Sequence, residues 1–361
     1  MMRLLITTQA VDLDEPALAN FHRWIEEFAQ RCESVHVICL KEGRHTLPTN
    51  VHVYSLGKAA AMAPSGRVAR IVSRVKYVSH FYSYVWRLRS SYDAVFVHMN
   101  PEYVILAGWW WRLQRRRIVM WYVHRQKSLM LRAAVFLVNT VCTTAKESIG
   151  VVSPKIVVMG HGIDVVQYTS QEPKVLSVDA PRIVSVGRIT PIKNLEVIVD
   201  AVAQLRERSI AATLDLVGVP TVATDFVYEK KVRDHVSELH LDTNVSFIGV
   251  VKNEDMPSLY PQYDFSVNAC PTGGIDKAVL ESMATGTIPL VCNVAFRDYF
   301  GSHADALLFE YRDAHSLTEK IAALLSRDDL PSLQQDLRAR AREKADVTVL
   351  IEGIHHLLFA Q

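Results

Sequence analysis

Two cations in the stretch from Arg182 to Leu195 (RIVSVGRITPIKNL) could bind a phosphate group. Arg188 follows a short β-branched run that is typical of a buried strand, and Lys193 comes after Pro191, which fits the first turn of a helix. Ligands of open α/β sheets bind at the carboxyl ends of strands, and free amides at a helix N-terminus favour negative charge. The pair therefore predicts a diphosphate site that needs no metal; the alternative, two solvated loop cations, stays open.

A second stretch, Gly273 to Leu290 (GGIDKAVLESMATGTIPL), has the pattern of a helix between two turns. Gly273 and Gly274 open it and let a ligand approach the backbone, and Gly286 ends it before the next strand. Glu281 lies inside the helix, where a carboxylate can accept hydrogen bonds from sugar hydroxyls, as the acidic residue of dinucleotide-binding folds does with ribose. The alternative is a solvated helix carboxylate, because glutamate is mostly exposed in proteins.

In these motifs the chain resembles glycosyltransferase family four, the retaining nucleotide-sugar transferases of GT-B fold. VGRITPIKN is similar to the family's VGR...K diphosphate motif, and GGIDKAVLESMATG is similar to its E-x7-E motif. WYVH (121–124) resembles a strand that ends in a donor-facing histidine, and VSFIGVV (245–251) resembles the segment that holds the nucleobase. The resemblance implies an α/β protein of two Rossmann-like domains whose parallel sheets face each other across a cleft.

The same resemblance implies a hexosyltransferase, independent of metal and of any other cofactor. It would move a sugar from a UDP- or GDP-sugar to a glycan or lipid-linked acceptor in the synthesis of a surface polysaccharide or glycolipid. The expected catalytic residues are His124, Arg188 and Lys193. The expected donor-binding residues are Gly187, Gly249, Val250, Val251, Gly273, Gly274, Ile275, Asp276, Lys277 and Glu281. Retention is expected without a protein nucleophile.

The sequence departs from the family at two places. Gly273 stands where the first glutamate of E-x7-E belongs, so a carboxylate that family members place near the donor sugar is missing, and Asp276 or Lys277 is left to supply a polar contact. The glycine-rich turn usual after the first strand is replaced by TTQAVDLDEP (7–16). Two alternatives therefore stay open: a nucleotide-sugar-binding protein without transfer activity, and a nucleotide-sugar epimerase. No G-x-G-x-x-G follows a strand, which disfavours an NAD-dependent dehydrogenase.

The loop after the first strand supplies the acceptor-side candidates, Gln9 and Asp12. Asp12 and Asp14 also form a D-x-D pair of the kind that metal-dependent transferases use. Because they precede Glu15 and Pro16, we expect them to cap a helix and expect no metal site there.

Charge is unevenly distributed along the 361 residues. The whole chain carries a net charge of +2, but residues 1–165 hold 21 Lys and Arg against 11 Asp and Glu, while residues 166–361 hold 19 against 27. The basic residues of the first half gather in three groups, one of them beside Trp109, Trp110 and Trp111: Arg67, Arg70, Arg74 and Lys76; Arg112, Arg115, Arg116 and Arg117; Arg125 and Lys127. Cations interleaved with aromatics favour a peripheral contact with an anionic membrane; a solvated helix face is the equal alternative. No nucleic-acid module accompanies the charge.

The five cysteines are scattered and lack metal-ligand spacing, which is typical of reduced thiols in the cytosol. The first apolar run is too short for a signal peptide, and no segment approaches about 18 consecutive apolar residues. We therefore expect a cytoplasmic protein, at the inner face of the cell membrane where its basic surface meets lipid.

Strand-like runs alternate with helical stretches along both halves, which is the rhythm of parallel sheets. We expect an acceptor-side Rossmann-like domain over 1–165 and a nucleotide-sugar-binding one over 180–345, joined by a polar linker near 171–179. The last expected strand is Leu307–Phe309. The apolar helix at 347–361 needs a surface to cover, and in GT-B relatives it packs back on the first domain.

Overall fold

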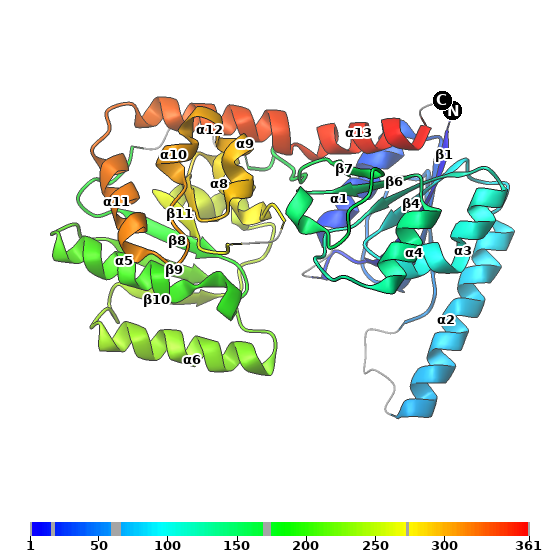
Figure 1. The fold of residues 1–361 in the computed structure, drawn as a ribbon, viewed down its shortest axis with the longest axis horizontal. Helices are drawn as coiled ribbons and strands as arrows, with labels where there is room; N and C mark the ends of the chain where they lie inside the picture. Colours follow the sequence, from blue (N-terminus) through cyan, green and yellow to red (C-terminus); the bar gives the residue numbers. More distant parts are fainter. Residues whose placement is uncertain (1, 16–18, 59–65, 169–174, 272–273, 360–361) are drawn as a thin grey trace. The chain divides into compact units, whose positions relative to one another are not determined.

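The computed structural model describes residues 2–15, 19–58, 66–168, 175–271 and 274–359, and it divides into two compact units. Unit 1 comprises Met1–Gly160 together with Val347–Gln361, and unit 2 comprises His161–Asp346. Each unit has a parallel sheet with helices on both faces (Figure 1), which confirms the predicted α/β class.

The sheet of unit 1 has seven parallel strands in the order β3-β2-β1-β4-β5-β6-β7. Their bounds are β1 (Arg3–Val11), β2 (Ser34–Glu42), β3 (Val51–Ser55), β4 (Ala94–His98), β5 (Arg117–Trp121), β6 (Thr140–Thr143) and β7 (Ile156–Val158). The order of the strands in the sheet reverses at β1, which pairs with β2 on one side and with β4 on the other.

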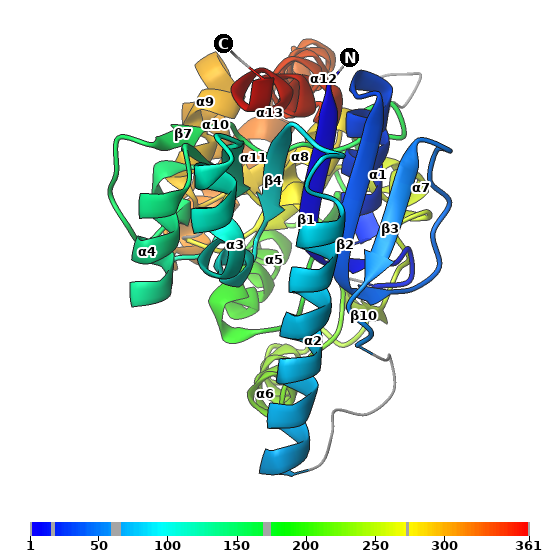
Figure 2. The same cartoon turned by 90° about the vertical axis from the view of Figure 1, so that its right-hand side faces the viewer.

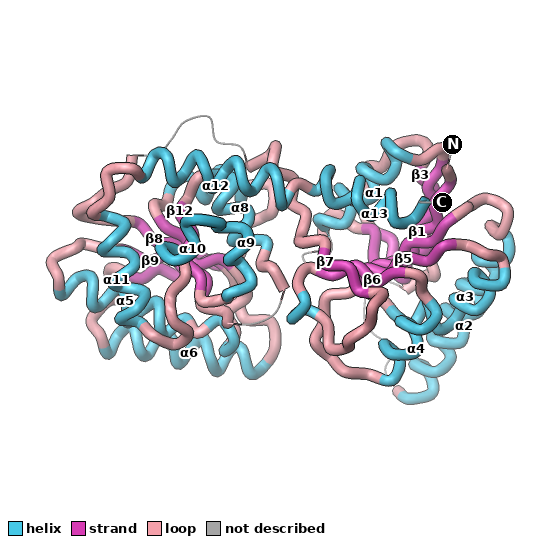
Figure 3. Tube along the Cα trace, turned by 45° about the horizontal axis from the view of Figure 1, so that its top comes forward, coloured by secondary structure: helices cyan, strands magenta, loops and turns pink. Residues whose placement is uncertain are grey.

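Alternate residues of β1 separate two cores in unit 1, as the period of two in a strand requires. Leu4 and Ile6 face one core, and Leu5 faces the other. The first face is covered by α1 (Ala19–Arg31) and α13 (Val347–Phe359); the second is covered by α2 (Arg67–Arg87), α3 (Pro101–Leu113) and α4 (Leu129–Leu137). Figure 3 shows these two helical layers on opposite sides of the strands. A short 3₁₀ turn, η1 (Lys146–Ser148), follows β6.

Helix α13 belongs structurally to unit 1, although it follows unit 2 in the sequence. It packs against α1 and places five apolar side chains in the first core: Val347, Leu350, Ile351, Ile354 and Leu358. Their spacing of three or four residues gives one apolar stripe along the helix.

Unit 2 has five parallel strands in the order β10-β9-β8-β11-β12. The strands are β8 (Arg182–Val186), β9 (Thr213–Val217), β10 (Val245–Gly249), β11 (Phe265–Asn268) and β12 (Ile288–Val291). The helices are α5 (Leu195–Glu207), α6 (Ala223–Glu238), α7 (Met256–Leu259), α8 (Lys277–Thr285), α9 (Arg297–Phe300), α10 (Ala304–Leu307), α11 (Ala314–Leu325) and α12 (Leu330–Ala345). The 3₁₀ turns are η2 (Pro191–Lys193), η3 (Tyr260–Gln262), η4 (Val294–Phe296) and η5 (Gly301–His303). Figures 1 and 3 show α8 and α12 on one side of the sheet and α5 and α6 on the other.

The strand expected at Leu307–Phe309 is wrong. Helix α10 runs to Leu307, whose neighbour Leu308 still donates its amide to the carbonyl of Ala304 at 2.9 Å. Only an isolated parallel bridge between Leu308 and Val291 remains beyond β12. Because Leu307 is the last residue of α10, the two apolar residues that remain are too few to form a strand.

The part of the chain that the structure describes contains no helix that is both long and apolar enough to cross a bilayer.

Candidate functional site

The predicted cations lie where the second sheet reverses its strand order. Strand β8 pairs with β9 on one side and with β11 on the other, so the segments that leave β8 and β11 diverge at the carboxyl edge. Such a divergence leaves room for a ligand, which is the general rule for open α/β sheets. Arg188 and Lys193 follow β8, while Asp276 and Lys277 follow β11.

Three glycines stand at the ends of adjacent strands β8, β9 and β10. Gly187, Gly218 and Gly249 all have positive φ, at 144°, 135° and 81°. The amide of Gly218 donates to the carbonyl of Gly249 at 2.8 Å, and a Cβ atom on Gly218 would lie 2.0 Å from the carbonyl oxygen of Gly187. Gly218 therefore lets the backbone that carries Arg188 approach the next strand. Sequence reasoning missed it, although its place directly after the apolar run of β9 was a usable signal.

Lys193 forms an ion pair with Asp276 across the divergence between β8 and β11. Its Nζ atom lies 2.5 Å from Oδ2 of Asp276, and the two side chains are 17% and 31% exposed. Burial lowers the pKa of Lys193, but the charge and hydrogen bond of Asp276 outweigh burial, so the pKa of Lys193 stands above its ordinary value. The ammonium is therefore charged at neutral pH, and Asp276 holds it at the carboxyl edge of the sheet, between the segments that leave β8 and β11.

Asp276 is the fixed point of this arrangement. It caps α8 by accepting the amide of Ala278 at 3.3 Å, and it accepts a second hydrogen bond from Nδ2 of Asn268 at 2.8 Å. Burial raises its pKa, yet Lys193 and these donors more than offset it, so the pKa of Asp276 lies below its usual value. Asn268 itself is held by the amide of Cys270, which donates to its Oδ1 atom at 3.1 Å. Asn268 is a second residue that sequence reasoning missed.

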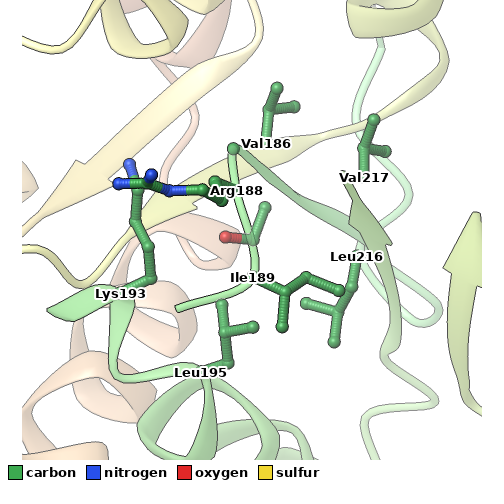
Figure 4. Close-up of a pocket in the computed structure, with 9 residues that line it drawn as sticks. Val186, Arg188, Ile189, Lys193, Leu195, Leu216 and Val217 are labelled. Carbon is green, nitrogen blue, oxygen red and sulfur yellow. The ribbon is translucent and has the colours of Figure 1, made fainter. Parts of the chain in front are cut away.

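Arg188 is the more open of the two cations. Its side chain is exposed and donates from Nη1 to Oγ1 of Thr221 at 3.4 Å, while Thr221 donates to Asp225 at 3.2 Å. Its charge acts on Lys193 and lowers the pKa of that residue, so the two cations lie within electrostatic range of each other. Figure 4 shows both side chains extending toward the same side of a small hollow. The hollow is lined by Ser185, Val186, Gly187, Arg188, Ile189, Lys193, Leu195, Leu216 and Val217.

Glu281 is buried, so its alternative reading as a solvated helix carboxylate is wrong. It is 9% exposed and accepts a hydrogen bond from the hydroxyl of Tyr260 at 3.1 Å, with Tyr168 also within hydrogen-bonding contact. Burial raises the pKa of Glu281 above its ordinary value, and nearby Lys277 opposes that shift. Neither tyrosine was singled out from the sequence, because their distance along the chain hides their contact with α8.

Lys277 sits in the first turn of α8, where the helix dipole disfavours a cation. The side chain is half-buried, and burial lowers its pKa below the ordinary value while Glu281 and Asp276 oppose that shift. Among the described residues its ammonium has no hydrogen-bond or ion-pair partner. A cation in such a position is costly unless a ligand compensates it.

The other donor-binding candidates lie on the same edge of unit 2. Gly249 ends β10 with no atom within 4 Å of a Cβ position, and Val250 beyond it is exposed while Val251 is half-buried. Ile275 is buried and Gly274 is half-buried just before α8. Gly273, which replaces the family's first glutamate, lies outside the described residues.

In unit 1 the three candidates differ in exposure. Gln9, near the end of β1, and His124, after β5, are exposed, and the ring of Tyr122 meets that of His124 edge-on at 5.8 Å. Asp12 is buried, where its carboxylate pairs with Lys41 at 2.9 Å. Sequence reasoning did not identify Thr8 and His98, which contact each other at 3.1 Å where this sheet reverses its own strand order.

The helix start that Asp12 and Asp14 were expected to cap adjoins residues 16–18, which lie outside the described residues. In the described part, the Oδ1 atom of Asp12 accepts the amide of Asp14 at 3.1 Å in a local turn. The ion pair with Lys41 is the first cause that holds the pKa of Asp12 below its usual value. A Cβ atom on Gly43 would overlap this carboxylate, so the glycine makes room for it. Among the described residues no cluster of three or more His, Cys, Asp or Glu could hold a metal ion.

Comparisons with known proteins agree with this architecture. Residues 180–327 match the family model of glycosyl transferases group 1. WcaL of Escherichia coli, named as a colanic acid biosynthesis glycosyltransferase, is 24% identical over 245 residues, which are 65% of this chain and 57% of WcaL. The chain thus spans little more than half the length of that relative. Mannosylfructose-phosphate synthase of Agrobacterium fabrum is 27% identical over 111 residues, 30% of this chain and 24% of that protein.

Solved structures extend the likeness to the whole fold. HepE of Anabaena in complex with UDP and glucose has a TM-score of 0.73 at 16% identity, with 100% of both chains covered. Sucrose-phosphate synthase of Thermosynechococcus elongatus also has a TM-score of 0.73 at 16% identity, with 99% of this chain and 98% of that chain covered. The group 1 match and the WcaL relative show that the chain is similar to glycosyltransferases, and the solved structures show that it shares their fold of two parallel-sheet α/β domains.

Proposed function

We propose that the protein is a retaining glycosyltransferase that moves a sugar from a UDP- or GDP-sugar to a glycan or lipid-linked acceptor in surface-polysaccharide synthesis. The observation that carries this proposal is the cation pair at the point where β8 and β11 diverge, with Lys193 held at 2.5 Å from Asp276 and Arg188 open beside it. The UDP complexes of HepE and the colanic acid name of WcaL support the donor and the pathway class.

In the proposed reaction, the bond between the anomeric carbon and the β-phosphate oxygen breaks and the electron pair leaves with the oxygen. Fixed cations stabilise the charge that grows on this oxygen, and they act most strongly when they are already oriented before reaction. Arg188 supplies such a charge directly. An ammonium has three N–H donors, so Lys193 keeps two for phosphate while one stays on Asp276. No metal is needed for this step.

The acceptor hydroxyl then forms the new bond to the anomeric carbon on the face that the phosphate leaves, and its proton passes to the departing phosphate oxygen or to water. No protein nucleophile enters this scheme. Exposed His124 is the proposed group for charge near the anomeric carbon, and Gln9 and Asp12 remain the proposed acceptor-side residues.

Glu281 and Lys277 would hold the nucleoside and sugar of the donor. Glu281 has acceptor capacity beyond its hydrogen bonds with Tyr260 and Tyr168 and would accept from sugar hydroxyls. Asp276 is already occupied by Lys193, Asn268 and the amide of Ala278, so Lys277 is the residue we propose in place of the missing glutamate contact. Gly249, Val250 and Val251 would contact the nucleobase.

We further propose that the protein works on the cytoplasmic side, with the basic unit 1 in peripheral contact with an anionic membrane that carries the acceptor. The net excess of Lys and Arg over residues 1–165 supports this contact.

Nucleotide release tests the proposal. The purified protein is incubated with labelled UDP- and GDP-sugars, with and without glycan acceptors, and free UDP or GDP is measured. We expect nucleotide release from one of the two donor classes, faster with an acceptor. An isomerised donor without nucleotide release would identify an epimerase. A donor that raises the melting temperature of the protein without any nucleotide release or sugar transfer would identify a nucleotide-sugar-binding protein. Gly273, in place of the family's glutamate, favours that alternative.

A further inference from the structure

Helix α2 carries a second apolar face that points away from the core of its own unit. Its inward face buries Phe81, Val85 and the following Leu88 in the core under α2, α3 and α4. The outward face consists of large apolar side chains that are all exposed: Val68, Ile71, Val72, Val75, Tyr82 and Trp86. We call these six residues the α2 face. Relative to Val68 they stand at positions i+3, i+4, i+7, i+14 and i+18, which places them along one side of a helix.

The exposed apolar residues of α2, a helix of 21 residues, form a continuous stripe. Val68 is 75% exposed and Val75 is 64% exposed, whereas exposed apolar residues on protein surfaces normally stand alone. Figures 1 and 2 show why: the first half of α2 extends beyond the strands and the other helices of unit 1. Four aliphatic side chains therefore stand in water where no other part of the described unit covers them.

The α2 face continues onto α3 through aromatic contacts. The rings of Trp86 and Trp110 lie 5.5 Å apart, and those of Trp109 and Trp110 lie 6.0 Å apart. Trp109 and Leu113 are exposed at the end of this series. Indole rings with one apolar and one polar edge are enriched at the headgroup level of membranes.

The charge around the α2 face has one sign. The helix holds five Lys and Arg and no Asp or Glu: Arg67, Arg70, Arg74, Lys76 and Arg87. Arg112 adds a further exposed cation near Leu113 on α3. A second copy of the chain would meet this helix with the same positive charge, which opposes self-association. An apolar stripe flanked by cations matches the surface of a bilayer with anionic headgroups.

We infer that the α2 face docks on an anionic phospholipid surface, with Val68, Ile71, Val72 and Val75 entering the boundary between headgroups and acyl chains. Tyr82, Trp86 and Trp109 would lie at headgroup level, and Arg70, Arg74 and Lys76 would contact phosphate. This inference gives the membrane contact of the proposed function a defined surface, but the docking itself does not depend on sugar transfer.

Vesicle sedimentation tests the surface. The full chain is mixed with vesicles of phosphatidylcholine alone or with about one third phosphatidylglycerol, at salt from about 50 to 500 mM. We expect binding to the anionic vesicles that weakens as salt rises. Ile71→Asp with Val75→Asp should weaken it about tenfold or more, since it removes apolar area and adds repulsion. A wild-type chain that does not bind anionic vesicles, or that binds neutral ones equally well, overturns the inference.

A matched control separates this surface from net charge. Phe226→Asp with Val227→Asp alters two exposed apolar residues on α6 of unit 2 and changes the net charge equally. This variant should bind vesicles like the wild type; an equal loss in both double variants overturns the assignment to α2. Arg74→Gln with Lys76→Gln keeps the apolar stripe and should reduce binding to the anionic vesicles, which keeps the test valid if the aspartate variant does not fold.

Two further readouts distinguish failure of docking from failure of the proposed function. Nucleotide release with a water-soluble acceptor should be unchanged in the variant of Ile71 and Val75. Arg188→Ala should retain vesicle binding, because it lies in unit 2, whatever its effect on donor turnover.

Discussion

At the scale of single residues, the ion pair between Lys193 and Asp276 organises the candidate site. The sequence predicted each residue separately, Lys193 from the turn after a strand and Asp276 from the start of a helix. It could not predict the pair, because the two are 83 residues apart and meet only where β8 and β11 diverge. The pair also turns Asp276 from a candidate donor contact into the residue that orients the lysine.

The variant Asp276→Asn tests that role. Asparagine can still cap α8, but Lys193 loses its counter-charge while it stays buried, so its pKa should fall and the protein should lose about 1–3 kcal/mol at pH 7. The depressed pKa of Asp276 stabilises the fold above its unfolded value of 3.8, and this contribution is lost as pH falls through the folded pKa. Urea unfolding should therefore show a wild-type advantage at pH 7 that shrinks toward pH 3; an advantage that is the same at both pH values contradicts the ion pair.

At the scale of elements, the regular alternation of apolar runs and helical stretches predicted a parallel sheet in each half, but it did not identify β7 (Ile156–Val158). It failed at Leu307–Phe309, where α10 takes the first residue of the run. It also missed Gly218, because the reason for that glycine is a contact between two strand ends. The carbonyl oxygen of Gly187 lies 2.0 Å from where a Cβ atom would stand.

Gly218→Ala should therefore be costly for the loop that carries Arg188. The new methyl group meets backbone that has to move, and the positive φ adds strain, so we expect a loss of about 2 kcal/mol or more and weaker donor binding. Gly249→Ala is the control, since it shares the positive φ but meets no atom within 4 Å. Urea unfolding compares the two variants, and donor titration is used for Gly218→Ala alone because Gly249 is itself a proposed nucleobase contact. An equal loss of stability in the two variants would mean that the close approach at Gly218 does not matter.

At the scale of the whole molecule, the chain crosses between its two units twice, because α13 returns to unit 1. The apolar pattern of 347–361 predicted a helix that needs a surface, but not which side chains it buries. The sequence also did not predict the outward apolar face of α2, since a sequence cannot tell which of two apolar stripes on a helix meets the core. It predicted only the basic clusters of this region.

Ile351→Ala should destabilise unit 1 even though the residue follows unit 2 in sequence. Ile351 is fully buried, and its truncation should cost about 2–5 kcal/mol. All six tryptophans belong to residues 1–160, so tryptophan fluorescence reports on unit 1 alone. The fluorescence transition should shift further for Ile351→Ala than for Leu337→Ala, an equally buried site in unit 2; the opposite order would contradict the packing of α13.

Turnover of the donor after loss of the cations tests the central claim most directly. With the donor that binds most tightly, nucleotide release is measured for the wild type, for Arg188→Ala, for Lys193→Ala and for Arg188→Lys. The account predicts that each alanine variant loses about 100-fold or more, with the lysine variant in between, because a preoriented cation stabilises the leaving phosphate. Nucleotide release that persists undiminished in both Arg188→Ala and Lys193→Ala would contradict it.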